Sequence, residues 1–237
     1  MNAKDLSIRL QKAAEFVPQD ARLADIGSDH AYLPVALMLQ DKISYGIAGE
    51  VVVGPYESAK RQVAKNGLES KIDVRLADGL EAVDLSDQVS AITICGMGGV
   101  LIRDILQRGK ENNRLSGKER LILQPNVGER QLRQWLVAEG YTITDETIIE
   151  ENNKIYEIIV AEKFLDTPEY SDRELFFGPA LLVEKSPVFI EKWQHKLIKT
   201  ENILNSLRQS DQDVSEKIRE VEQEIEWIKE VLADAGK

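Results

Sequence analysis

The sequence has little cysteine and little histidine: Cys95 is its only cysteine, and it has two histidines, His30 and His195. One cysteine cannot form an internal disulfide, which is typical of proteins of the reducing cytoplasm. The same shortage excludes a cysteine-rich zinc site within one chain and argues against a histidine-rich one. We therefore expect a cytoplasmic protein without a resident metal.

Long apolar segments are also missing. No run of about 18 apolar residues could span a bilayer, and the N-terminal region lacks the basic and apolar pattern of a secretory signal. The sequence thus predicts no membrane segment. At 237 residues, 43% hydrophobic and 30% charged, it can build one large domain with an appendage.

An overall excess of positive charge is absent as well. The net charge of −11 argues against general nucleic-acid affinity. Locally, however, residues 103–133 contain eight basic and four acidic side chains. Two interpretations stay open for this stretch: a solvated helical face, or a track for phosphates.

The rest of the chain is organised around residues 23–34. A short apolar run enters at Leu23, turns at Gly27 and leaves into an apolar helical segment. A strand, a tight glycine turn and a helix start form a cradle for an anion or a nucleotide, because the helix end offers unpaired N–H donors. We expect Asp25 and Gly27 to line a cofactor site here, with the side chains of Ser28, Asp29 and His30 beside it.

Strand-like and helix-like segments alternate after this point, following an N-terminal helix over 4–16. The predicted strands are 22–27, 44–53, 72–76, 89–95 and 120–123, and the helices 31–40, 56–66, 100–109 and 129–139. A hairpin of strands 141–151 and 155–164 follows. Alternation predicts a mostly parallel α/β sheet with right-handed crossovers. The closing hairpin favours a class I S-adenosylmethionine-dependent methyltransferase sheet of seven strands.

Acidic residues stand at or near the ends of three of these strands, of which the second ends at or near Glu50. Asp25, Glu50 and Asp78 suit a cationic, ribose-bearing cofactor, with Glu50 accepting from the ribose hydroxyls and Asp78 from the adenine amino group. Ligands of open α/β sheets bind beyond the carboxyl ends of the strands, and we call this side of the sheet its carboxyl edge. S-adenosylmethionine therefore fits better than a nicotinamide dinucleotide, whose Gly-x-Gly-x-x-Gly turn is missing.

The end of the fourth strand reads Cys95-Gly96-Met97-Gly98-Gly99. Enzymes that methylate exocyclic amines commonly place an Asn or Asp before Pro-Pro-aromatic here, so this sequence favours attack by a ring nitrogen. Cys95 as a nucleophile is a weaker alternative, because it lacks the Pro-Cys context and follows an apolar strand.

The character of the chain changes after residue 164, so we predict domains at 1–164 and 165–237. Residues 165–187 read as a loop. Apolar residues then recur at heptad spacing, and the polar stretch 209–213 favours two helices in an antiparallel coiled coil. One long helix that dimerises is the alternative to this monomeric arrangement.

Four motifs together resemble the TrmK family of bacterial tRNA (adenine-22-N1)-methyltransferases. They are Asp25-Ile-Gly-Ser-Asp-His-Ala-Tyr-Leu-Pro34, Ile94-Cys-Gly-Met-Gly-Gly99, Leu123-Gln-Pro-Asn126 and Tyr156-Glu-Ile-Ile-Val160. The resemblance covers the whole chain. It implies S-adenosylmethionine bound by Asp25, Gly27, Glu50, Asp78 and Gly96, an adenine in the D-loop of tRNA as acceptor, and a C-terminal coiled coil that helps to hold the tRNA.

Our mechanistic hypothesis gives the remaining residues their roles. Asp29 stabilises the charge that develops on the base, and Asn126 aligns the base edge. The other predicted contacts comprise Gly79 and Met97 for the cofactor; Tyr32, Gln124 and Pro125, with Met97, for the base; and Arg103, Arg108, Arg130 and Arg133 for phosphates. Two alternatives remain: a methyltransferase for another RNA base or a small molecule, and a non-catalytic adaptor that works through its helices.

Overall fold

A computed structural model describes residues 6–210 and 213–234 of the chain. These residues form two compact units, which divide between Ala180 and Leu181. Residues 165–180 thus belong to the first unit, whereas the sequence placed the division after residue 164. The reason is that Tyr170 returns to the sheet, where its hydroxyl accepts from the backbone N–H of Ile143 at 3.2 Å.

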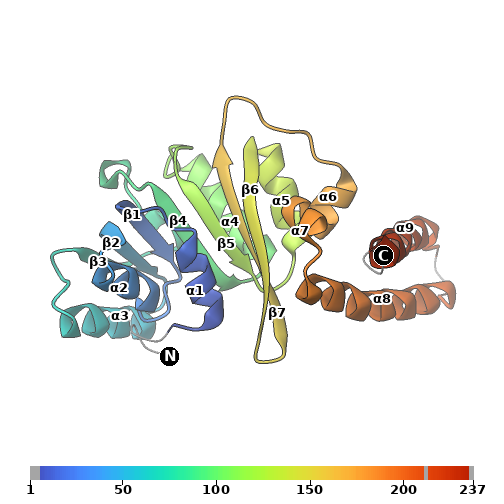
Figure 1. Cartoon of the computed structure of the whole chain (residues 1–237). Coiled ribbons are helices and arrows are strands. Elements are labelled where there is room, and N and C mark those ends of the chain that lie inside the picture. Colours follow the sequence, from blue (N-terminus) through green and yellow to red (C-terminus); the bar gives the residue numbers. More distant parts are fainter. Residues whose placement is uncertain (1–5, 211–212, 235–237) are drawn as a thin grey trace. The chain divides into compact units, whose positions relative to one another are not determined.

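The first unit is built on a seven-stranded sheet with the order β3-β2-β1-β4-β5-β7-β6 (Figure 1). β7 runs antiparallel to both of its neighbours, and the other pairs are parallel. The strands are β1 (Ala21–Ile26), β2 (Ile43–Glu50), β3 (Ile72–Leu76), β4 (Ala91–Met97), β5 (Arg120–Pro125), β6 (Tyr141–Glu151) and β7 (Lys154–Lys163). This is the predicted methyltransferase sheet with its closing hairpin.

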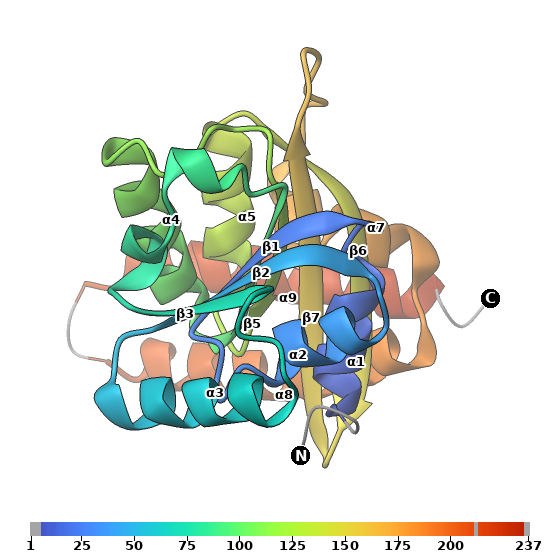
Figure 2. The same cartoon turned by 90° about the vertical axis from the view of Figure 1, so that its left-hand side faces the viewer.

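Helices cover both faces of this sheet (Figure 2). One face carries α1 (Ile8–Glu15), α2 (Tyr32–Leu39) and α3 (Val53–Lys65); the other carries α4 (Gly99–Glu111) and α5 (Glu129–Ala138). Neighbouring strand residues point to opposite cores: Leu23 packs with the first group of helices and Ala24 with the second. Both faces are therefore buried, which explains the continuous apolar runs of the central strands.

Several predicted boundaries differ from the structure by a few residues, and two of the differences have a clear local cause. Residues 4–5 of the predicted first helix lie outside the described residues; the helix begins at Ile8, because Ser7 caps it by accepting from the backbone N–H of Leu10 at 3.3 Å. The fourth strand continues to Met97 rather than stopping at Cys95. Its pairing with β5 shifts register between Cys95 and Met97, so Gly96, with a φ of 81°, forms a bulge inside the strand.

The predicted loop over 165–187 contains two short helices, α6 (Asp172–Phe177) and α7 (Pro179–Glu184). The signal for α6 is a capping box. The Ser171 hydroxyl accepts from the backbone N–H of Glu174, and the Glu174 carboxylate accepts from the backbone N–H of Ser171 at 2.8 Å. Prolines and glycine around this segment hid the signal.

The second unit contains α8 (Pro187–Arg208) and α9 (Ser215–Asp234), which pack as an antiparallel hairpin. Two ion pairs fix the direction, because Glu201 pairs with Lys229 at 2.8 Å and Arg208 with Glu222 at 2.6 Å. Leu204, Val221 and Ile225 form the buried seam. The single long helix considered as an alternative is therefore wrong. Residues 211–212 of the predicted turn lie outside the described residues.

Within the described ranges, none of the helices has both the length and the apolar character needed to cross a membrane.

Candidate functional site

The loop after β1 has an unusual backbone. Gly27 has a φ of 68°, and the three consecutive residues Asp29, His30 and Ala31 have φ values of 46°, 68° and 57°. For residues other than glycine this left-handed conformation costs about 1–2 kcal/mol each. Asp29, His30 and Ala31 thus adopt a backbone conformation that glycine takes without this cost. Such strain at the carboxyl end of a strand is typical of a binding site.

Asp25 closes β1 beneath this loop and is 3% exposed. Its two oxygens accept from the Ser28 and Thr93 hydroxyls, each at 2.6 Å. Burial raises the pKa of Asp25 to about 6, although both hydroxyls oppose the rise. Ser28 was predicted to bind the cofactor, and its hydroxyl donates to Asp25. Sequence reasoning missed Thr93, whose signal is a polar residue within an apolar strand.

Glu50 ends β2 next to the loop and is 6% exposed. Its Oε1 atom is buried and has no hydrogen-bond partner among the described residues. Burial raises the pKa of Glu50, while the backbone of Asp29 and His30 opposes the rise by hydrogen bonding. A buried oxygen without a donor is unfavourable in the folded protein. It fits a ligand that brings hydroxyl donors, as the ribose of S-adenosylmethionine does.

Asp78 follows β3, where the sequence placed an adenine contact. It is exposed and pairs with Arg108 of α4 at 2.7 Å. The Arg108 guanidinium holds the pKa of Asp78 below its usual value. Gly79 is buried, and a Cβ there would lie 3.0 Å from the Ile105 side chain. Gly79 therefore allows α4 to pack closely, and Asp78 and Arg108 remain candidates for ligand contact.

The three glycines at the end of β4 and directly after it have different surroundings. A Cβ on Gly96 would lie 3.1 Å from the Arg9 guanidinium, and a Cβ on Gly99 would collide with the backbone oxygen of Gly128. Only at Gly98 would an added Cβ have nothing within 4 Å, so of these three it alone opens free space. Met97 reaches over Gly27, where a Cβ would collide with its Cε atom. Met97 therefore joins the ends of β1 and β4.

The end of β5 contributes two amides. The Gln124 Oε1 atom accepts from the backbone N–H of Gly96 at 2.9 Å and from Arg9. The Gln124 Nε2 atom donates to the Asn126 Oδ1 atom at 3.3 Å, and the Asn126 Nδ2 atom donates to the Gly96 carbonyl at 2.8 Å. Gln124 and Pro125 are buried, whereas Asn126 is exposed. Asn126 is thus the accessible amide of the two, and base contacts by the buried Gln124 and Pro125 stay a prediction.

Side chains from segments distant in sequence contact each other, or the loop after β1, near this site. Arg9 of α1 lies over the Tyr156 ring, with 5.4 Å between its Cζ atom and the ring centroid. His30 shares a 2.6 Å hydrogen bond between its Nδ1 atom and the Ser58 hydroxyl, and its ring lies 5.4 Å from that of half-buried Tyr32. Tyr156 stands in a motif quoted above. Nothing in the local sequence of α1 signalled Arg9.

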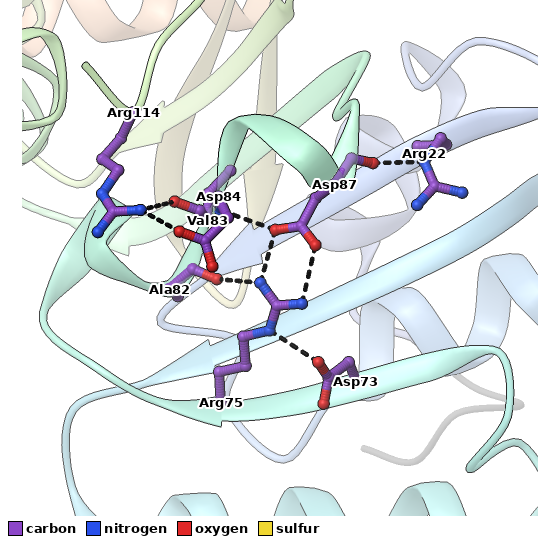
Figure 3. Close-up of polar contacts among 8 residues, drawn as sticks. All are labelled: Arg22, Asp73, Arg75, Ala82, Val83, Asp84, Asp87 and Arg114. Atoms are coloured by element: carbon purple, nitrogen blue, oxygen red, sulfur yellow. Dashed lines mark hydrogen bonds and ion pairs between the residues drawn. The ribbon is translucent and has the colours of Figure 1, made fainter.

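The basic stretch 103–133 is largely neutralised in space. Six of its eight basic side chains pair with carboxylates: Arg103 with Asp104, Arg108 with Asp78, Lys110 with Glu139, Arg114 with Asp84, Arg120 with Glu162, and Arg133 with Glu146 and Glu157. Asp84, the partner of Arg114, lies close in sequence to Asp87, which makes a bidentate contact with Arg75 at 2.6 and 2.9 Å (Figure 3). Except for Asp104, the carboxylates that pair with this stretch lie outside residues 103–133, and they offset the charge excess counted along the sequence.

Arg133 corrects a specific prediction. Its side chain is 0% exposed, and it donates to Glu146 at 2.6 Å and to Glu157 at 2.5 Å. Burial opposes its charge, but the two carboxylates hold its pKa above the usual value. Gly178 touches this triad, since a Cβ there would lie 2.7 Å from both partners of the Arg133–Glu146 pair. Arg133 joins α5, β6 and β7 and cannot contact a phosphate.

Arg103 and Arg108 remain accessible on α4, and half-buried Arg130 stacks on the Phe176 ring at 5.4 Å. In the described part of the chain, no group of three or more His, Cys, Asp or Glu side chains is arranged to hold a metal ion. Burial raises the pKa of the Cys95 thiol to about 12, which argues against a role as nucleophile.

The chain is similar to known proteins over most of its length. The family model "tRNA (adenine(22)-N(1))-methyltransferase" (TrmK) matches residues 23–230. The tRNA (adenine(22)-N(1))-methyltransferase of Bacillus subtilis is 46% identical over 98% of this chain and 99% of its own length.

Two solved structures carry the cofactor or its product. A Streptococcus pneumoniae protein described as a putative tRNA (m1A22) methyltransferase in complex with S-adenosyl-L-methionine has a TM-score of 0.86 and 47% identity, over 96% of this chain and 100% of that one. Mycoplasma capricolum TrmK with S-adenosyl-homocysteine has a TM-score of 0.82 and 28% identity, over 96% and 98%. On the strength of the family match over 23–230 and the identity to the Bacillus subtilis enzyme, the chain belongs to the tRNA (adenine(22)-N(1))-methyltransferase family.

Proposed function

We propose that this chain transfers a methyl group from S-adenosylmethionine to N1 of adenine 22 in bacterial tRNA, giving N1-methyladenosine. The donor half of the proposal is carried by Glu50, a buried carboxylate with an oxygen that lacks a donor, beside a strained left-handed loop. The acceptor half is supported by membership of the family.

The residues at the carboxyl edge fit this cofactor. Glu50 would accept from the ribose hydroxyls, Gly27 would let the backbone approach the ligand, and Asp78 would meet the adenine edge after releasing Arg108. Asp25 would act from below, because its carboxylate holds Ser28 and Thr93 and so shapes the loop. When bound, S-adenosylmethionine supplies an electrophilic methyl group on a sulfonium.

The chain's own contribution to the reaction is orientation and charge. The attacking N1 atom of adenine has a lone pair in the ring plane, so no protein base has to remove a proton first. As N1 gains a methyl group the base becomes cationic, and the exposed Asp29 carboxylate would stabilise that charge. Asn126, exposed at the end of β5, would orient the base edge.

The target base has to leave its stack to reach this edge. Half-buried Tyr32 and Met97 are the apolar surfaces that would pack against it. Arg103, Arg108 and Arg130 are the proposed phosphate contacts, since exposed ion pairs are weak enough to exchange partners. We also propose that the protein works as a monomer in the cytoplasm; its two C-terminal helices pair within one chain, and its single cysteine suits a reducing compartment.

The test is to incubate the protein with bacterial tRNA and methyl-labelled S-adenosylmethionine, and to identify the modified nucleoside by mass spectrometry. We expect N1-methyladenosine, lost when a matched transcript carries guanosine at position 22. Methylation of another nucleoside would move the acceptor to another RNA base. Cofactor binding without any tRNA methylation would favour a small-molecule acceptor, and absence of cofactor binding would favour the adaptor.

A further inference from the structure

The amides of Gln124 and Asn126 form a chain of hydrogen bonds. Its direction is set at the Gln124 end by Arg9 together with the backbone, since the Gln124 Nε2 group also donates to the Pro125 carbonyl at 2.8 Å. A guanidinium has only N–H donors, so the Gln124 atom that faces Arg9 has to be its carbonyl oxygen. The backbone N–H of Gly96 makes the same demand on this oxygen at 2.9 Å. With Oε1 committed to two donors, the Gln124 Nε2 group points away from them.

This orientation passes to Asn126. The Gln124 Nε2 group donates to the Asn126 Oδ1 atom at 3.3 Å, so Asn126 has to turn its oxygen toward Gln124 and its Nδ2 group toward the Gly96 carbonyl, at 2.8 Å. Asparagine amides can otherwise flip between two nearly isosteric states. Here one state satisfies every partner, and the exposed Asn126 keeps acceptor capacity on Oδ1.

That polarity has a chemical consequence for the base. The Watson–Crick edge of adenine carries an amino donor at N6 beside the N1 acceptor that takes the methyl group. Guanine carries an oxygen acceptor and a protonated N1 at the same places. A carbonyl oxygen that meets the N6 amino group recognises adenine and leaves its N1 lone pair free, whereas a flipped amide would place a donor there.

We propose that Arg9 is a positioning residue that makes the site selective for adenine, by fixing the Asn126 amide so that its oxygen accepts from the N6 amino group. This inference rests on the proposed function. Arg9 is itself held in place, because it stacks on Tyr156 and packs closely against Gly96, where a Cβ would lie 3.1 Å from the guanidinium.

The experiment compares the wild type with Arg9→Met on two tRNA transcripts, one with adenosine at position 22 and one with purine riboside, which lacks the N6 amino group. Labelled S-adenosylmethionine reports methylation of both. We expect Arg9→Met to lower kcat on adenosine by about 10-fold or more, because Gln124 Oε1 loses its charged donor and keeps only the Gly96 N–H, so that the two amides are held less firmly in this orientation. On purine riboside the same variant should stay within about 2-fold of the wild type, since no amino group is there to be read.

Two controls separate this effect from damage to the fold. Arg22→Met removes a comparable arginine, which stacks on Tyr45 at 4.4 Å and donates to the Asp87 carbonyl at 2.5 Å, but lies at the start of β1; it should leave both activities unchanged. In an Asn126→Ala background, Arg9→Met should cause no further loss if it acts through Asn126.

Equal losses on both transcripts, an undiminished rate on adenosine, or an additive loss in the Asn126→Ala background would each overturn the inference. A wild type that fails to methylate the adenosine transcript would instead refute the proposed function, and this inference with it.

Discussion

Two groups of buried carboxylates in the first unit differ in their partners. Glu146 and Glu157 lie on the closing hairpin and share the cation Arg133. Asp25 and Glu50 lie at the edge near the left-handed loop, and the contacts described there include no cation: Asp25 accepts from two hydroxyls, and Glu50 has an oxygen without a donor among the described residues.

The difference separates stability from binding. A buried carboxylate whose charge is matched by a buried arginine serves to join elements, and removing either partner leaves an uncompensated charge. Glu50 has a buried oxygen with neither a cation nor a donor among the described residues, which is unfavourable in the folded chain by itself and is explained best by a ligand. The following predictions test this division, starting from the largest effect.

Breaking the triad should have the largest effect on stability. Arg133→Met leaves two buried carboxylates without their cation, and we expect the free energy of unfolding to fall by about 3–5 kcal/mol. Chemical denaturation monitored by circular dichroism measures it. The matched control is Arg103→Met, which removes an exposed pair with Asp104 and should change stability by about 1 kcal/mol or less. Similar losses in the two variants would contradict a special role for the triad.

The uncompensated carboxylate Asp25 should make stability depend on pH in the opposite sense from an ordinary ion pair. Its pKa is about 6 in the folded protein against an ordinary value of 3.8, so the folded state binds the proton more tightly than the unfolded state. This contribution to stability is therefore greatest below pH 3.8, falls between pH 3.8 and about 6, and is constant above. The change amounts to about 3 kcal/mol.

Asp25→Asn removes this titration while keeping a side chain that can bond to Ser28 and Thr93. The difference in unfolding free energy between wild type and Asp25→Asn, measured from pH 4 to pH 8, isolates the effect from other carboxylates. A difference that does not vary with pH, or that moves in favour of the wild type as pH rises, would contradict the account.

Asp29 extends the comparison with Asp25 and Glu50, because its carboxylate lies in the same loop region but is exposed. We expect Asp29→Asn, which removes the charge but tolerates a positive φ, to lower kcat by about 10-fold or more and to change cofactor affinity by less than about 2-fold. Asp29→Gly serves as the control for strain: it should lose the same activity while gaining about 1 kcal/mol of stability. An equal collapse of cofactor affinity would assign Asp29 to the cofactor site instead.

Much of this edge was predictable from the sequence because the strands are local patterns. The strand Ile72–Leu76 has the predicted bounds, and the acidic residues at the ends of β1 and β2 lie where alternation places them. Partners distant in sequence were not predictable. Arg9 meets Gln124 across a separation of 115 residues, and Arg133 looked like one more basic residue of a helix until β6 and β7 supplied its carboxylates.

The central claim is best tested by measuring S-adenosylmethionine affinity by calorimetry and unfolding free energy for Glu50→Gln and Glu146→Gln side by side. Each replaces one buried carboxylate by its neutral isostere. The account predicts that Glu50→Gln weakens binding by about 10-fold or more without loss of stability, and that Glu146→Gln keeps the affinity but loses stability. A stability loss in Glu50→Gln with unchanged affinity, or equal changes in both variants, would contradict it.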